Sequence, residues 1–157
     1  MATPKIMKPH GSKFEYEKQR NEDLMRAFNE LIEAAPYICL SSIYSQLVNR
    51  PSSRFWVSEE RAAIVIAAMM KGDRLERMRP NKREMFYEIY RRAMILKKEK
   101  PTLSIFELAF QVVKQKAPKF YLTPGSAEVI IYRTKKLFSA SKRIAKRAWP
   151  SRPKNNS

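Results

Sequence analysis

Two five-residue segments of the chain place a cation, two aromatic residues, an aliphatic residue and a hydroxyl in the same order. They are Arg54-Phe55-Trp56-Val57-Ser58 and Lys119-Phe120-Tyr121-Leu122-Thr123. A Ser or Thr that caps a helix lies beside free N–H groups, and a neighbouring cation completes a site for an anion. We therefore expect Arg54, Lys119 and Thr123 to contact phosphate, with Tyr121 beside them. Helix capping by itself also explains the two hydroxyls.

The aromatic residues of these segments have a structural explanation as well. Large aromatic side chains are usually buried in folded proteins. We expect Phe55 and Phe120 to fill the core, and Trp56 and Tyr121 to seal the joint between two helices.

Both segments belong to a longer internal repeat. Residues 36–66 align without a gap on residues 101–131, at an offset of 65, and six of the 31 pairs are identical. Similarity at a fixed offset indicates repeated structure and is sought before other signals. The helices expected on the N-terminal side of the two copies match at the same offset. The sequence therefore predicts an internal duplication of one three-helix unit.

Helix signals and breakers divide the chain into five parts. The expected parts are a flexible arm (1–11), helical unit one (12–72), a charged connector (73–80), helical unit two (81–149) and a flexible tail (150–157). The helix starts rest on capping signals, in which a side chain accepts from a free backbone N–H. These signals are Ser12 with Glu15, Ser58, Asn81 with Glu84, Ser104 with Glu107, and Thr123 followed by Pro124.

A short helix followed by a break and a capped helix resembles the helix-turn-helix class of DNA-binding modules. The break spans eight residues (50–57), whereas the class has a turn of about three or four. If the third helix of unit two enters a groove, the resemblance implies exposed contacts near its start, including Ser126. The expected fold is all-α, with two tandem helix-turn-helix-like units and a long basic C-terminal helix.

The charge of the chain is large and unevenly distributed. It has 32 Lys and Arg against 15 Asp and Glu, a net charge of +17. Residues 1–70 hold nine basic and eight acidic side chains, whereas residues 71–157 hold 23 and seven. Such asymmetry points to a polyanionic partner, with nucleic acid ahead of an anionic membrane. We expect DNA in preference to RNA, bound by unit two and the last helix.

The last helix is expected to run from Thr123 to Trp149 without a breaker. Apolar residues mark one face of it, and basic residues line much of the remainder. The basic side chains expected to contact nucleic acid are Arg133, Lys135, Lys136, Lys142, Arg143, Lys146 and Arg147.

The residues needed for catalysis or for metal binding are scarce. His10 is the only histidine and Cys39 the only cysteine, and three glycines cannot build a Gly-rich phosphate loop. A metal site depends on several converging ligands. We therefore expect no enzymatic activity, no metal and no cofactor.

Three further expectations follow from composition. A single cysteine fits a reducing, cytoplasmic setting, and no apolar run approaches the roughly 20 residues that span a bilayer. A small basic helical protein fits a phage or mobile-element origin. The alternative to nucleic-acid binding is a structural or assembly adaptor, such as a virion component. Its basic surface would meet an acidic protein or a packaged genome, and the chain would form a homo-oligomer.

Overall fold

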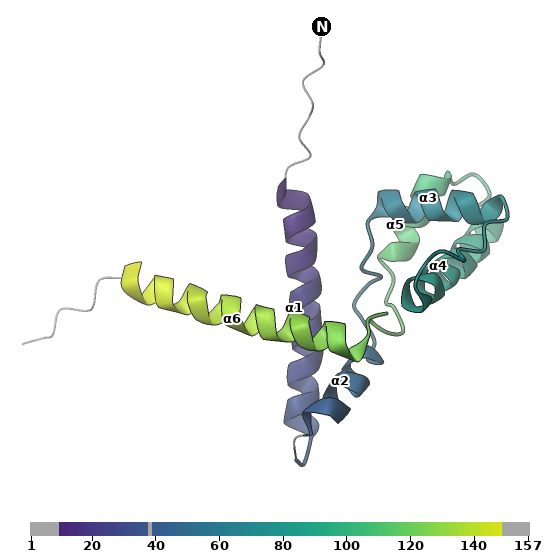
Figure 1. The fold of residues 1–157 in the computed structure, drawn as a ribbon. Helices are drawn as coiled ribbons and strands as arrows, with labels where there is room; N and C mark the ends of the chain where they lie inside the picture. Colours follow the sequence, from purple (N-terminus) through teal and green to yellow (C-terminus); the bar gives the residue numbers. More distant parts are fainter. Residues whose placement is uncertain (1–9, 38, 149–157) are drawn as a thin grey trace, which may run out of the picture.

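The computed structural model describes residues 10–37 and 39–148, which form six helices and no strand, so the all-α prediction is confirmed (Figure 1). The helices are α1 (His10–Ala34), α2 (Leu40–Val48), α3 (Glu59–Met70), α4 (Pro80–Glu99), α5 (Ile105–Val113) and α6 (Pro124–Ala148).

Several helix starts agree with the capping signals. The Ser58 hydroxyl accepts from Arg61 N at 3.1 Å, and Ser104 and Glu107 form the expected capping box. Helix α6 begins at Pro124, directly after Thr123. These starts were predictable because a cap depends on residues only a few positions apart.

Two other starts differ from the sequence prediction. Helix α1 already begins at His10, so Ser12 lies inside it. Helix α4 begins at Pro80 rather than near Asn81, because the fixed φ of proline suits the first helical position. The N-cap of α2 is Cys39, which makes no side-chain capping bond.

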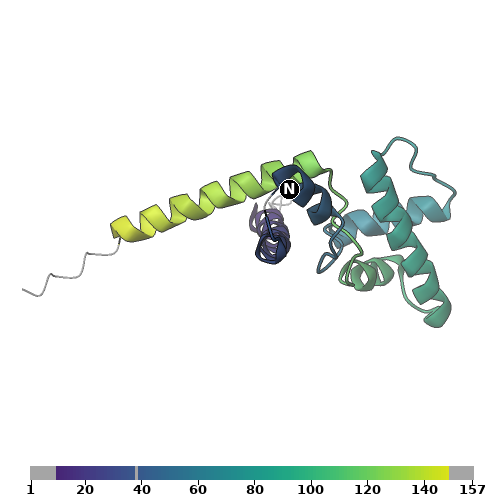
Figure 2. The same cartoon turned by 90° about the horizontal axis from the view of Figure 1, so that it is seen from below.

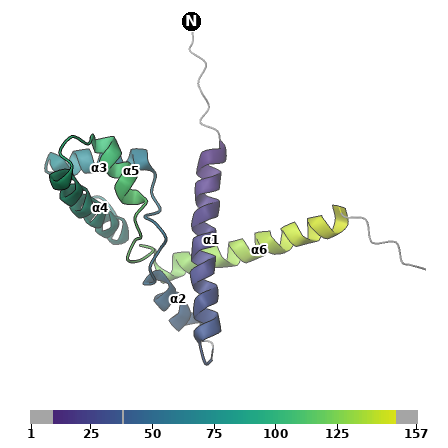
Figure 3. The same cartoon turned by 180° about the vertical axis from the view of Figure 1, so that it is seen from behind.

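The helices do not group in chain order. Helices α1, α2 and α6 pack together and form the first body, whereas α3, α4 and α5 form the second body. Figures 2 and 3 show the two bodies side by side, joined by two connections. This grouping differs from the consecutive units 12–72 and 81–149, because each third helix packs against the first two helices of the other half.

The two connections that join the bodies are linker one (residues 49–58) and linker two (residues 114–123). They meet at a single antiparallel bridge, where Ser52 and Ala117 each donate to the other's carbonyl at 3.0 Å. On either side, Phe55 N donates to Val113 O at 2.9 Å and Phe120 N donates to Val48 O at 3.1 Å. These bonds hold the linkers together where they cross.

Successive side chains of each linker enter different cores. Phe55 and Val57 lie in the core of the second body, whereas Trp56 between them packs against the core of the first. In linker two the order is reversed, with Phe120 in the first core and Tyr121 in the second. Each linker therefore contributes side chains to both cores. The expected burial of Phe55 and Phe120 is confirmed.

Positions 65 apart occupy corresponding places in the two halves. Helices α2 and α5 match at both ends, α1 and α4 at their last residues, and α3 and α6 at their first residues. Two ion pairs also correspond, because Asp23 pairs with Arg26 as Glu88 does with Arg91. The halves differ in length chiefly at the two outer helices, α1 and α6.

Helices α2 and α3 make no contact with each other in the part of the chain that the structure describes. A helix-turn-helix requires its two consecutive helices to be joined by a short turn. That arrangement is therefore not formed by α2 and α3. The neighbour of α2 in the position of a third helix is α6.

Candidate nucleic-acid interface

Arg54 is held by contacts within the protein. Its guanidinium donates to the carbonyls of Phe55 and Val57, each at 3.1 Å, and lies 3.6 Å from a carboxylate oxygen of Glu59. The same group lies 5.2 Å from the centre of the Trp56 ring. These contacts close the end of linker one over α3 and bind two of the five N–H donors of the guanidinium to carbonyls.

Three of the predicted residues come together at the start of α6. Lys119, Tyr121 and Thr123 line a cavity of about 350 Å³ between the end of α2 and the starts of α4 and α6. Lys119 Nζ lies 2.6 Å from Glu84 Oε1, and Ser126 N donates to Thr123 Oγ1 at 3.1 Å. The Thr123 hydroxyl thus caps α6 as expected, and Lys119 has Glu84 as its carboxylate partner.

Tyr121 is a buried part of this region. Burial, reinforced by the negative charges of Glu88 and Glu84, raises the pKa of its hydroxyl to about 12. Its ring stacks on Phe55 with the centroids 6.1 Å apart, and its backbone φ is 56°. Tyr121 therefore joins linker two to the core of the second body and exposes little surface to a ligand.

Helix α6 carries the predicted cations along its length. It has seven basic residues and one acidic residue, and its C-terminal half extends beyond α1 (Figure 1). Arg133, Lys135, Lys136 and Lys142 are exposed. The side chains of Arg143, Lys146 and Arg147 lie outside the described part of the structure. The 25 residues of α6 span about 37 Å. Among the six described helices, α6 is the most strongly basic.

Only the first half of α6 is buried along its apolar face. Ala127 and Ile131 lie in the first core, whereas Leu137 and Phe138 are 69% and 61% exposed. Where α6 crosses α1, Lys135 Nζ lies 4.5 Å from the centre of the Phe28 ring. Helix α1 has six acidic and four basic residues, so the packing of α6 on α1 places the basic helix against an acidic one.

A buried carboxylate fastens linker one to α1. Asp23 Oδ2 accepts from Ser53 N and Ser53 Oγ, both at 2.9 Å, and from Trp56 Nε1 at 3.0 Å. Its other oxygen accepts from Arg26 at 2.7 Å. Burial would raise the pKa of Asp23, but the hydrogen bonds from Arg26, Ser53 and Trp56 outweigh it and hold the pKa below its ordinary value.

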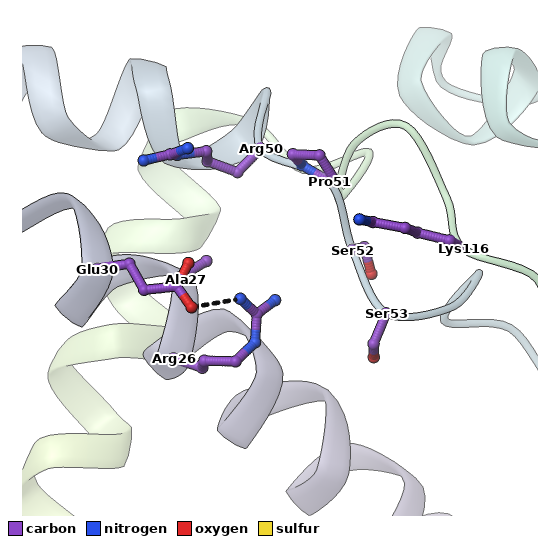
Figure 4. Close-up of a pocket in the computed structure, with 8 residues that line it drawn as sticks. All are labelled: Arg26, Ala27, Glu30, Arg50, Pro51, Ser52, Ser53 and Lys116. Atoms are coloured by element: carbon purple, nitrogen blue, oxygen red, sulfur yellow. Dashed lines mark hydrogen bonds and ion pairs between the residues drawn. The ribbon is translucent and has the colours of Figure 1, made fainter.

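A cavity of about 480 Å³ lies beside this carboxylate, between α1 and the crossing linkers (Figure 4). Its lining includes three cations, Arg26, Arg50 and Lys116, and one carboxylate, Glu30. The sequence analysis did not identify Arg50 or Lys116. Their position next to the two helix breaks was visible in the sequence, but the contact between linkers that brings them together was not.

Other kinds of site find little support in the described residues. No group of three or more His, Cys, Asp or Glu side chains in them could hold a metal ion. None of the described helices combines the length and the apolar character needed to cross a membrane. Comparison of the chain with protein-family models, with curated proteins and with solved structures found no match.

Proposed function

We propose that this chain is a non-enzymatic nucleic-acid-binding protein whose affinity comes mainly from phosphate contacts. The observation that carries the proposal is helix α6, which has seven basic residues against one acidic residue and whose C-terminal half extends beyond its crossing with α1. Such a helix can approach a polyanion without rearrangement of the core. Contacts between cations and phosphates position a protein on a duplex and supply most of its nonspecific affinity.

Duplex DNA suits this helix better than duplex RNA. An α-helix with its side chains is about 10–12 Å wide, and the major groove of B-DNA is about 12 Å wide. The corresponding groove of A-form RNA is deep and narrow and excludes side chains. Helix α6 could lie in the groove or along its phosphate rim, and in both positions cations on several of its faces would contact phosphates.

We also propose that the two halves arose by duplication, and that α2 and α6 pack as the last two helices of a helix-turn-helix-like unit, without the short turn that joins them in that class. The matched helix ends and the paired hydrogen bonds at an offset of 65 support the duplication. Because α6 packs against α1 and α2, it has the place of a third helix. Helix α3 has the same place in the second body, but it begins with Glu59 and Glu60, which disfavour phosphate.

A salt titration of binding tests the proposed function. The full chain would be titrated onto labelled duplex DNA, duplex RNA and single-stranded DNA at four or more salt concentrations. We expect duplex DNA to bind most tightly, with log K falling linearly against log[salt] by about 0.9 for each phosphate contacted. Affinity that does not change with salt would contradict the proposal.

The alternative, an assembly adaptor, is favoured by one observation. Leu137 and Phe138 are exposed next to each other on α6, with the Lys142 ammonium 4.7 Å from the centre of the Phe138 ring. An adaptor would bury this surface against another copy or an acidic protein. Light scattering after size exclusion, with and without DNA, separates the two functions. A defined oligomer that requires Leu137 and Phe138 and ignores DNA would favour the adaptor.

A further inference from the structure

The cavity between α1 and the crossing linkers is rimmed by cations from three segments. Arg26 lies on α1, Arg50 follows α2 in linker one, and Lys116 belongs to linker two. Figure 4 shows Arg50 and Lys116 on opposite sides of Pro51, with Arg26 turned towards Glu30. The volume of about 480 Å³ is within the range of small-ligand pockets, about 300–1,000 Å³.

The cations differ in how far they are already neutralised. The Arg26 guanidinium is bound at 2.7 Å to Asp23 and at 2.9 Å to Glu30. Among the described residues, no carboxylate lies within ion-pair distance of Arg50 or Lys116. Glu30, the carboxylate that lines the cavity, is therefore paired with Arg26, and the other two positive charges are left to attract an anion.

The corresponding place in the other half is filled. At an offset of 65, Ala27 corresponds to Arg92, whose guanidinium donates to Lys116 O at 2.8 Å and lies 4.9 Å from the centre of the Phe55 ring. The methyl group of Ala27 is too small to fill the matching space as Arg92 does, and Ala27 lines the cavity there. Arg50 likewise stands where the other half has Gln115, which accepts from Arg92 at 3.3 Å. One half thus closes this space with its own side chain, and the other keeps it open and positive.

We propose that this cavity binds a phosphate group of the nucleic-acid backbone, held by Arg50 and Lys116. A guanidinium matches two phosphate oxygens with paired N–H donors, and a lysine ammonium adds a point charge. Ser53 does not supply a donor, because its N–H and its hydroxyl are both bound to Asp23. The proposal rests on the proposed function for the source of the phosphate.

The test uses the full chain with Arg50→Gln and Lys116→Gln, singly and together. The control is Lys71→Gln with Lys82→Gln, which removes the same charge from exposed positions on the second body. Thermal melting in chloride alone checks that every variant folds. Binding is then measured with a duplex oligonucleotide across salt concentrations, and melting is repeated with inorganic phosphate at constant ionic strength.

We expect the double variant to bind the duplex about tenfold more weakly and to lower the salt slope by about 0.9, the value for the one phosphate that the two cations hold. Phosphate should raise the melting temperature of wild type and control but not of the double variant. Equal losses of affinity in the control and the double variant would overturn the inference, as would a phosphate effect that survives in the double variant. If the wild type binds no oligonucleotide, the proposed function itself fails, whereas normal duplex binding by the double variant overturns this site alone.

Discussion

Ser52 and Ala117 donate their backbone N–H groups to each other's carbonyls at 3.0 Å, and they are the only isolated bridge in the described chain. The two residues are 65 positions apart, so Ser52 has the same position in the first half of the chain as Ala117 has in the second half. The pair thus marks the point about which the linkers cross. Beyond it, each linker carries its third helix to the body formed by the other half.

A disulfide between these positions tests the crossing. Residues that exchange both backbone bonds have Cα atoms about 5.5 Å apart, which is within the range of disulfides. In a Cys39→Ser background, Ser52→Cys with Ala117→Cys should oxidise readily within one chain, giving faster migration on a non-reducing gel. The control pairs Ala117→Cys with Cys at exposed Ser45 and should remain reduced. Failure of the first pair to crosslink in folded protein would contradict the crossing.

Asp23 provides a prediction for pH. Its pKa is lower in the folded chain than in the unfolded chain, so the stability it contributes is complete above the unfolded value, about 3.9. That contribution is lost as the pH falls from about 4 through the folded pKa, because the unfolded state binds protons first. Asp23→Asn should lower the free energy of unfolding at pH 7 by about 2 kcal/mol and flatten its dependence on pH below 4.

Chemical denaturation at pH 7 and pH 3 measures both effects. The control is Glu22→Gln on the same helix, because the ion pair of Glu22 with Lys18, at 4.0 Å, lies at the surface. Its cost should stay below about 0.5 kcal/mol. Equal destabilisation by the two substitutions would mean that Asp23 does not fasten linker one to α1.

Phe55→Ala should be among the most destabilising single substitutions. The Phe55 side chain is 1% exposed, stacks on Tyr121 and lies beneath Arg92. Removing a buried phenylalanine costs about 3–5 kcal/mol, and here it also weakens the contact between linkers. Phe106→Ala, at a site that is 51% exposed, is the control and should cost about 1 kcal/mol or less. Denaturant unfolding of both variants measures the difference.

The local features of this fold could be predicted from the sequence, whereas the pairing of its helices could not. The caps at Ser58, Ser104 and Thr123 depend on neighbouring residues, and the structure forms them. In contrast, α3 and α6 begin at corresponding positions, and the apolar face of either helix could pack against α1 and α2. Long linkers between the second and third helices permit either pairing, and exchange of equivalent elements costs little.

The candidate site was partly predictable for the same reason. The cations of α6 follow from the sequence of one helix, and the described ones are exposed as expected. The hydrogen bonds of Arg54 to two carbonyls depend on the path of linker one. The cavity at Arg50 and Lys116 depends on two segments that meet only where the linkers cross. Comparing Ala27 with Arg92 at the 65-residue offset was a usable signal, because it marks a place where the halves differ in volume and charge.

Two triple variants that remove the same charge distinguish the role of α6 in binding from that of the total charge of the chain. Arg133→Gln, Lys136→Gln and Lys142→Gln alter exposed positions of α6, whereas Arg74→Gln, Arg77→Gln and Arg79→Gln alter the exposed connector between α3 and α4. If α6 contacts the phosphates, the first set should lower the slope of log K against log[salt] by up to about 2.7, at 0.9 per contact. The second set should change affinity only slightly, because screening weakens charges beyond about 10 Å. Equal slopes in the two triple variants would show that binding follows net charge and not the position of α6.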